Sequence, residues 1–248
     1  MDNTVGSLGR ALTSQQKALI IGTLLGDGSF EFVTSGKNVR LQILHSGKQE
    51  EYVRWKYRIL QSLVRTEPKL TSIFDERYGR SYTRMRFRTL CHNEFVQLRK
   101  IFYRGSRKIV PKEIDTLLID PLSLAVWYMD DGKWRPDCRG IYLDTICFSI
   151  GEQKLLISCL QNNFGVGECK LHWNGEGYHI YIPYPASMRF RAIILPHVIP
   201  SMIYKLPPIT PERLSRRKFR QDRVESQSYN TPVSRQQSVS IKEVGMKI

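Results

Sequence analysis

Two neighbouring carboxylates, Asp130 and Asp131, stand where a structural acid is unfavourable. The apolar run before them opens at Asp120 and Pro121, a capping residue and a first-turn residue typical of a helix start, and Gly132 supplies a natural end. The run is apolar almost all round, which predicts a buried helix. Because the C-terminal end of a helix carries partial negative charge, acids in the last turn are disfavoured. A bound cation would remove this conflict.

A second apolar run with the same layout lies earlier in the chain and ends at Asp27, followed by Gly28. Asp27 is in register with Asp131, since each directly precedes a glycine. Gly22 and Gly26, one helical turn apart, would let two such helices approach closely. The sequence therefore predicts a pair of packed helices whose acidic ends lie side by side. The alternative is two unrelated core helices with solvated acidic ends.

The elements that must position these helices also repeat. Both copies read as a helix, strands, a second helix, more strands and a third helix, followed by a Lys-apolar-Pro stretch. A Thr13-Gln16 capping box opens the first copy. After the first long helix, the first copy should contain a strand at 39–43, a helix at 48–64, a strand at 81–89 and a helix at 93–103. The second copy should contain a strand at Ile141–Ser149, a helix at 151–164, a hairpin of 170–173 with 178–182, and a helix at 188–195.

Arginines alternate with apolar residues between Ser81 and Thr89. In a strand, this spacing places Arg84, Arg86 and Arg88 on one face and the apolar side chains on the other. Arginine matches phosphate and the guanine edge bidentately, and a two-stranded ribbon fits the major groove. A row of like charges is self-repelling without a partner, so the pattern favours nucleic-acid binding over a merely solvated sheet face.

Composition supports a polyanionic partner. The chain has 248 residues, 41% of them hydrophobic, and a formal net charge of +15. A basic folded body favours nucleic acid, the alternative being solubilising charge. Five cysteines without C-x-x-C spacing argue against a zinc site or a disulfide framework and suit a reducing compartment. We expect no membrane partner, because no apolar run reaches transmembrane length and no signal-peptide core is present.

The runs ending at Gly28 and Gly132 resemble the two motifs of the LAGLIDADG homing endonucleases, and the similarity extends over about residues 15–210. The stretch 127–132, Trp-Tyr-Met-Asp-Asp-Gly, is the specific part. The chain is similar to the single-chain, two-motif branch found in organellar introns. This resemblance implies an α+β fold of two pseudo-symmetric αββαββα halves, with paired central helices and two antiparallel sheets forming a DNA-binding saddle. The expected boundaries are 1–12 for an N-terminal arm, 13–117 for the first half, 118–210 for the second half and 211–248 for a basic, polar tail that we expect to be disordered.

The second helix departs from the family pattern at one position that matters for packing. Val126 stands where the motif has a glycine, so we expect a less symmetric helix pair. Leu25 and Met129 occupy the first acidic position of each motif, a substitution common in this branch.

The resemblance implies metal-dependent hydrolysis of DNA phosphodiesters. This chemistry needs an in-line water and neutralisation of charge on the attacking and leaving oxygens, which divalent ions held between carboxylates supply. Mg²⁺ prefers oxygen ligands, and Mn²⁺ is an expected substitute. We predict Asp27 and Asp131 as the metal ligands. The carbonyls of Gly26 and Asp130, freed at the helix ends, are further candidate ligands, and the Asp130 side chain competes for the catalytic role.

Two lysines enter only through the resemblance. Lys108 and Lys205 match the family positions whose lysine borders each active site, where it can organise the nucleophilic water or offset developing negative charge. Without the resemblance, both would be interpreted as exposed loop lysines.

Candidate DNA contacts lie on the outward faces of the predicted strands, and phosphate contacts would make the affinity strongly salt-dependent. The histidines among them could equally be surface residues without a function. These candidates are Arg40, Gln42, Arg84, Arg86 and Arg88 in the first half, and Lys170, His172, Tyr178 and His179 in the second.

The leading hypothesis is a site-specific, Mg²⁺-dependent double-strand DNA endonuclease that acts as a monomer with an internal pseudo-dimer. The alternatives are an RNA maturase that helps a group I intron to splice, and a DNA-binding protein without cleavage. Retention of both aspartates and both lysines favours the enzyme. We expect an intracellular protein, in the mitochondrion or chloroplast if an organelle encodes it and otherwise in the bacterial cytoplasm.

Overall fold

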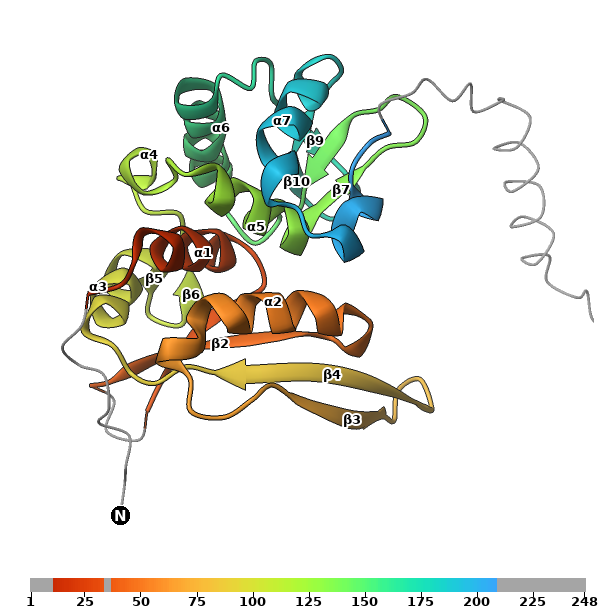
Figure 1. The fold of residues 1–248 in the computed structure, drawn as a ribbon. Helices are drawn as coiled ribbons and strands as arrows, with labels where there is room; N and C mark the ends of the chain where they lie inside the picture. The colour runs from red at the N-terminus through yellow and green to blue at the C-terminus, as the bar shows by residue number, and fades with distance from the viewer. Residues whose placement is uncertain (1–10, 34–36, 209–248) are drawn as a thin grey trace, which may run out of the picture. The chain divides into compact units, whose positions relative to one another are not determined.

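Each half of the chain builds its own four-stranded antiparallel sheet. The computed structural model describes residues 11–33 and 37–208. Within them the order αββαββα occurs twice, which confirms the predicted α+β fold class (Figure 1). The elements of the first half are α1 (Ser14–Leu25), β1 (Ser29–Phe32), β2 (Val39–Ser46), α2 (Glu50–Leu60), β3 (Lys69–Asp75), β4 (Arg80–Arg88) and α3 (Asn93–Phe102).

A short connection joins the halves before the second copy begins. It consists of a two-stranded hairpin and one turn of helix. The connection and the second half comprise β5 (Tyr103–Arg104), β6 (Arg107–Lys108), α4 (Ile114–Leu117), α5 (Pro121–Asp131), β7 (Gly132–Trp134), β8 (Ile141–Leu143), α6 (Ile150–Phe164), β9 (Lys170–Trp173), β10 (Tyr178–Ile182), α7 (Ala186–Ile194) and a 3₁₀ turn, η4 (Pro200–Lys205).

The two motif helices begin as their sequences predict. Thr13 and Gln16 form a reciprocal capping box at the start of α1, and the Asp120 carboxylate accepts the N–H of Leu122 at the start of α5. Every residue from Leu122 to Asp130 is buried, which confirms that α5 is a core helix rather than an amphipathic surface helix. Both caps satisfy helix-end donors that burial would otherwise leave unpaired.

The motif helices pack directly on each other, in the middle of a core that is continuous between the halves (Figure 1). A Cβ added at Gly22 would lie 2.3 Å from the carbonyl oxygen of Ser123 and 2.8 Å from the Cβ of Val126. Such distances are prohibitive, so only glycine permits this approach. Gly22 thus makes room for the valine that replaces the motif glycine in the second helix, and the pair is asymmetric at this level.

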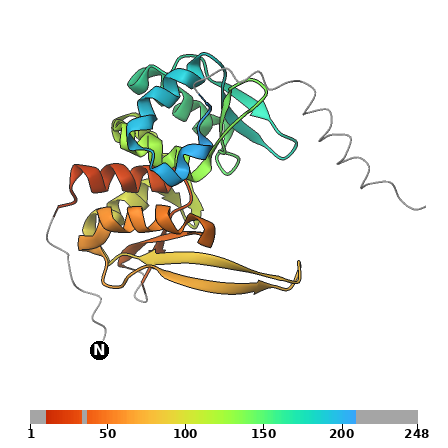
Figure 2. The ribbon, with the colours of Figure 1, turned by 45° about the vertical axis from the view of Figure 1, so that its right-hand side comes forward.

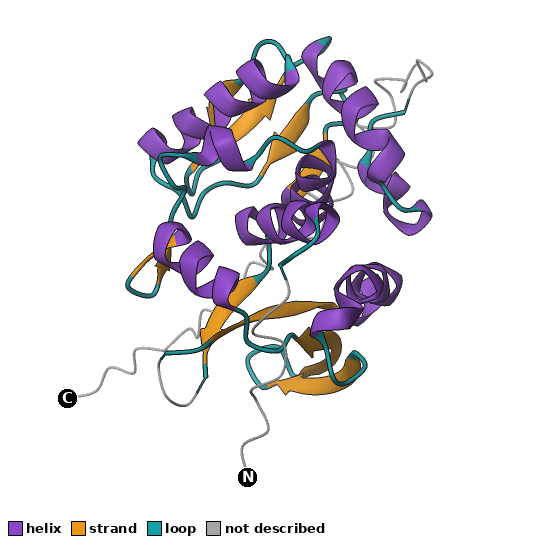
Figure 3. Cartoon of the chain, turned by 60° about the vertical axis from the view of Figure 1, so that its left-hand side comes forward, coloured by secondary structure: helices purple, strands orange, loops and turns teal. Residues whose placement is uncertain are grey.

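The sheets have the same strand order, β1-β2-β4-β3 and β7-β8-β10-β9. Val39, Leu41 and Ile43 on β2 are buried, whereas Arg40 and Gln42 between them point to the opposite face, as their alternation predicts. In the first half α2 and α3 cover the apolar face of the sheet (Figure 3). The β3–β4 hairpin extends past α2 (Figure 2), and most of β3 is exposed.

The strand predicted over Ile141–Ser149 is wrong beyond Leu143. The hydroxyl Oγ1 of Thr145 accepts the N–H of Ile180 at 3.2 Å, so a side chain takes the place of the next backbone partner in the ladder. The chain then turns, and Ser149 caps α6. A side chain that competes with the ladder in this way gives no signal in the alternation of apolar and polar residues.

The remaining expectations concern the two ends of the chain and membrane-spanning helices. Residues 1–10 of the predicted arm and the predicted tail, 211–248, lie outside the described residues. Leu12, at the end of the predicted arm, is buried, and its N–H donates to Glu94 at 2.8 Å. In the described part of the chain, no helix combines the length and apolarity that a membrane crossing requires.

Candidate active site at the paired helix ends

The acidic ends of α1 and α5 meet at a second close contact between the two helices. A Cβ added at Gly26 would lie 2.5 Å from the Cβ of Asp130, so the Asp130 side chain fills the space that Gly26 leaves empty. The main-chain N–H of Asp27 donates to Oδ2 of Asp130 at 3.2 Å. This bond joins the two predicted motifs directly, across the boundary between the halves.

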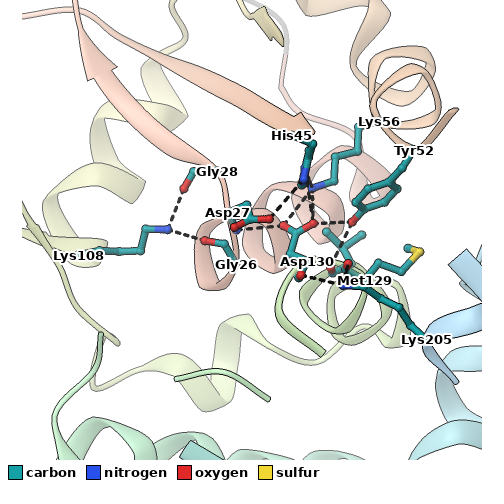
Figure 4. A network of polar contacts seen from close by, with 11 residues as sticks. Gly26, Asp27, Gly28, His45, Tyr52, Lys56, Lys108, Met129, Asp130 and Lys205 are labelled. Carbon is teal, nitrogen blue, oxygen red and sulfur yellow. Dashed lines mark hydrogen bonds and ion pairs between the residues drawn. The ribbon is translucent and has the colours of Figure 1, made fainter. Parts of the chain in front are cut away.

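Asp27 is partly exposed, with 46% of its side chain accessible, and carries a hydrogen-bonded histidine (Figure 4). Its Oδ2 lies 3.3 Å from Nδ1 of His45 at the end of β2. Burial alone would raise the pKa of Asp27, but the hydrogen bond from His45 and the positive charges of Lys56 and Lys205 lower it below its usual value. Asp27 is therefore an ionised carboxylate held in a fixed direction.

Asp131 has the opposite electrostatic environment. Burial and the negative charges of Asp130 and Asp27 together raise its pKa to about 8, although the positive charge of Lys108 opposes them. The folded protein therefore disfavours the charged form of this carboxyl near neutral pH. A cation beside the helix ends would remove that penalty, which is what the position of the acid on the last turn predicts.

Each helix end is bound by one lysine (Figure 4). Lys108 Nζ, at the end of β6, donates to the carbonyls of Gly26 (2.7 Å) and Gly28 (2.8 Å). Lys205 Nζ, at the end of η4, donates to the carbonyls of Met129 (2.5 Å) and Asp130 (2.9 Å). Burial lowers the pKa of both lysines, and the surrounding aspartates partly restore it. The carbonyls of Gly26 and Asp130, which we predict as metal ligands, thus already accept ammonium hydrogen bonds.

The Asp130 carboxylate is fully buried and saturated by protein groups. Lys56 Nζ on α2 donates to both of its oxygens, at 2.7 and 3.0 Å, and the Tyr52 hydroxyl donates to Oδ1 at 2.7 Å. Neither side chain of the Lys56–Asp130 pair is accessible to solvent. A cation approaching Asp130 through its side chain would have to displace this ammonium group, so Asp27 and Asp131 are the better placed carboxylates.

His45 contacts Asp27 through one ring nitrogen and Lys56 through the other. Lys56 Nζ lies 3.3 Å from Nε2 of His45, and an ammonium group can only donate. Nε2 therefore accepts, which leaves the proton on Nδ1, facing Asp27. Asp27, Asp130 and His45 offer three ligand atoms within 4.8 Å of one another, but the Lys56 ammonium group already occupies the cationic position among them.

Sequence reasoning missed His45, Tyr52 and Lys56 as parts of this network. One signal was available: Lys56 lies four residues after Tyr52, on the face of α2 that is otherwise buried. A lysine on a buried helical face requires an anionic partner. The sequence does not identify that partner, which lies 74 residues away.

The predicted arginine row is present on the outward face of the first sheet. Arg84, Arg86 and Arg88 of β4 pair in register with Ser46, Leu44 and Gln42 of β2. Arg86 is exposed, and Lys69 of β3 is its partner on the other side. The structure differs from the expectation in one respect, because an acidic residue lies on the same face. Glu31 of β1 forms ion pairs with Arg88 (2.8 Å) and with Arg40 of β2 (3.1 Å).

The second sheet carries an aromatic cluster on the face that includes His172. His172 stacks on Tyr181 with a ring separation of 4.4 Å, and its Nδ1 lies 3.0 Å from the Tyr142 hydroxyl. Lys170 lies opposite Tyr181 on the same face. The cluster comprises Tyr142, His172, His179 and Tyr181, with Arg135 and Lys133 over the Tyr142 ring.

Tyr178 is misplaced among the predicted contacts of the second half. It precedes Ile180 and Ile182, which are buried against the helices, and strand alternation puts it on their side of the sheet. Its ring packs edge-on against Trp173 instead. Arg135, Tyr142 and Tyr181 were not predicted as members of this face from the sequence. Their common position depends on the register of β7, β8 and β10.

Comparisons with known proteins identify the family to which the chain is similar. The model of the LAGLIDADG DNA endonuclease family matches residues 17–190. DNA endonuclease I-ChuI of Chlamydomonas applanata is 33% identical over 210 residues, covering 79% of this chain and 96% of that protein. Cytochrome b mRNA maturase bI2 of Debaryomyces hansenii is 29% identical over 202 residues, covering 79% of this chain and 75% of the maturase.

A solved structure is similar over the same part of the chain. It is the homing endonuclease I-WcaI bound to its DNA recognition sequence, with 29% sequence identity and a TM-score of 0.73. The match covers 79% of this chain and 88% of that chain.

Proposed function

Because the chain belongs to the LAGLIDADG DNA endonuclease family, we propose that it is a homing endonuclease that makes a double-strand cut at a specific DNA site. The supporting observation is geometric. Asp27 and Asp131 end two helices in close contact, and Lys108 and Lys205 each bind one helix end. One chain supplies both helices, so a monomer suffices to act on both strands.

Divalent metal chemistry fits the donor set. The acids and helix-end carbonyls offer oxygen ligands, which suit Mg²⁺, with Mn²⁺ as a substitute. Asp27 and Asp131 would hold the ion. Bound there, it would supply neutralisation of the charge that develops on the attacking and leaving oxygens. The raised pKa of Asp131 supports this assignment, since the carboxylate lacks a positive partner strong enough to keep it ionised.

Lys108 and Lys205 would act beside the acids. Each ammonium group is held by two carbonyl oxygens at its own helix end, so its position is fixed before substrate arrives. A fixed positive charge next to the scissile phosphate would stabilise the developing negative charge or orient the attacking water. Burial lowers the pKa of both lysines, which favours proton exchange with that water.

DNA recognition would use the outward sheet faces. Arg86, flanked by Lys69 and Leu44, is the most open guanidinium group of the β4 row. Arg40 and Arg88 would exchange Glu31 for a phosphate or a base edge, so Glu31 keeps them oriented in the free protein. Gln42, Arg84, Lys170 and His172 complete the proposed contact set, which would make binding steeply salt-dependent.

A second candidate function is assistance of intron RNA splicing. The observation in its favour is the similarity to the bI2 maturase over 79% of the chain. A DNA-binding protein without cleavage would not require both aspartates and both lysines together. An intron-encoded protein would work where its intron is carried, in the mitochondrion or chloroplast for an organellar genome.

Cleavage of a plasmid library with randomised target sites tests the proposal. With Mg²⁺ the purified protein should cut a defined sequence on both strands, and EDTA should abolish the cut. Salt-sensitive DNA binding with no cut on any sequence, in Mg²⁺ or Mn²⁺, would contradict the endonuclease function. Stimulated splicing of an intron RNA would then support the maturase function.

A further inference from the structure

A basic, aromatic hollow lies on the helix-covered side of the first sheet, away from the arginine row. It measures about 680 Å³, within the usual range of ligand pockets. β1, β2, α3 and β5 contribute to its wall, and α3 and β5 adjoin each other (Figure 1). Its charged lining residues in the described chain are all basic: Lys37, Arg99 and Lys100.

Strand register places this hollow on the face opposite to the proposed DNA contacts. Phe32 of β1 pairs with Val39 of β2, and Val39 is fully buried on the helix side. Glu31 and Arg40, the adjacent pair, point to the arginine face. A ligand in the hollow would therefore not compete with a duplex on the outward sheet face.

The hollow contains a preformed stacking surface. The Arg99 guanidinium lies over two rings, 4.2 Å from the Phe32 centroid and 4.4 Å from the Tyr103 centroid. Its Nη2 also donates to the carbonyl of Gly105 at 3.1 Å, which fixes the plane of the group. Phe32 nevertheless remains 53% exposed, so much of its ring is free to contact a further flat group.

We propose that this hollow binds an unpaired nucleotide of a single-stranded polynucleotide, with the base on Phe32 and the phosphate near Lys37 and Lys100. Aromatic rings with adjacent positive charge are what single-strand sites use, because every base has a face to stack and every nucleotide a phosphate to neutralise. A duplex does not offer this combination, since its bases are stacked inside. The site goes beyond the proposed cleavage of double-stranded DNA and does not depend on it.

Fluorescence anisotropy with labelled single-stranded RNA and DNA oligonucleotides tests the site in the full chain. Phe32→Ala should weaken binding about ten-fold, the value of one stacked base. Lys100→Ala should reduce the slope of log affinity against log salt by about 0.7, the contribution of one phosphate contact. Phe74→Ala, which removes another exposed phenylalanine, and Lys154→Ala, which removes an exposed lysine, are matched controls and should leave both quantities unchanged.

Excess unlabelled duplex DNA should not displace the single strand. Unaltered binding by Phe32→Ala, complete displacement by the duplex, or no binding by the wild-type protein would each overturn the site. Equal affinity for RNA and DNA would support recognition through base and phosphate, and preference for RNA would support an added 2′-hydroxyl contact. Plasmid cleavage measured on the same variants keeps this result separate from the proposed function, because Phe32→Ala should still cut.

Discussion

Asp27 and Asp131 stand at equivalent positions in the two motifs. Their surroundings nevertheless lower the pKa of Asp27 and raise the pKa of Asp131. His45 and the nearby lysines favour the charged form of Asp27, whereas burial and two neighbouring acids disfavour that of Asp131. After burial, the largest cause at Asp131 is the negative charge of Asp130, whereas Asp27 has the hydrogen bond from His45 and the positive charge of Lys56. A cation at the helix ends would benefit Asp131 most.

The stability of the metal-free protein should therefore depend on Asp131 and pH. The folded state raises the pKa of this carboxyl from 3.8 to about 8, so its contribution is fully present below 3.8 and is lost as the pH rises towards 8. In EDTA, the Tm of the wild-type protein should fall relative to that of Asp131→Asn across this interval. Mg²⁺ should restore the wild-type Tm at the alkaline end. Parallel curves of Tm against pH for the two proteins would show that folding does not raise the pKa of Asp131.

The buried pair of Lys56 and Asp130 should be costly to break from one side. Lys56→Met keeps most of the side-chain volume but leaves the Asp130 charge without its ammonium partner, which should lower the free energy of unfolding by about 3–5 kcal/mol. Urea denaturation measures this loss.

Lys17→Ala is the matched control, because it breaks an exposed pair with Glu94 and should cost about 1 kcal/mol or less. A similar small loss for Lys56→Met would mean that the buried pair is stabilised by its packing alone.

The close pairing of α1 with α5 depends on glycine at positions 22 and 26, and Gly22 gives the cleaner test because it lies away from the acidic helix ends. Gly22→Ala places a methyl group 2.3 Å from the Ser123 carbonyl oxygen, so the helices must separate, and we expect a loss of about 1–3 kcal/mol of unfolding free energy. Gly151→Ala in α6 is the control, since nothing lies within 4 Å of the added carbon, and it should be neutral or stabilising. Equal effects in urea denaturation would contradict the close approach.

The β4 strand gives a test of the proposed DNA face. Arg86→Ala should weaken binding of the target duplex by about 1–3 kcal/mol if the guanidinium contacts a base edge. The control is Arg54→Ala, which removes an arginine paired with Glu50 on α2. Anisotropy with the cognate duplex and with a mismatched duplex measures affinity and discrimination. Equal affinities for wild type and Arg86→Ala would place the DNA elsewhere.

Element order and the helix pair could be predicted from the sequence because both follow from local patterns. Capping residues, apolar runs and the small residues Gly22 and Gly26 all act within a few positions of one another. The end of β8 could not be predicted, because it depends on the Thr145 hydroxyl meeting Ile180. The Lys56–Asp130 pair and the Glu31 bonds were missed for the same reason, since they join side chains that only tertiary packing brings together.

The described part of the chain has two halves with the same element order, which differ where they contact each other. In the first motif Gly26 has no side chain to neutralise, and α6 of the second half buries Gln153, Leu156, Cys159 and Leu160, with no charged residue among its buried positions. In the second motif Asp130 replaces that glycine, and α2 of the first half supplies Lys56 and Tyr52. Acid and base thus match across the boundary between the halves, which ties the two motifs into one site.

In the proposed mechanism, Asp27 and Asp131 form one metal-dependent cleavage site. The most direct measurement compares cleavage and binding of the identified target duplex by wild type, Asp27→Asn and Asp131→Asn, with Asp115→Asn on α4 as an exposed-acid control. We predict that both active-site variants fold and bind the duplex in Ca²⁺ but make no double-strand cut in Mg²⁺, while Asp115→Asn cuts normally. Cleavage by Asp131→Asn at the wild-type rate would contradict the account.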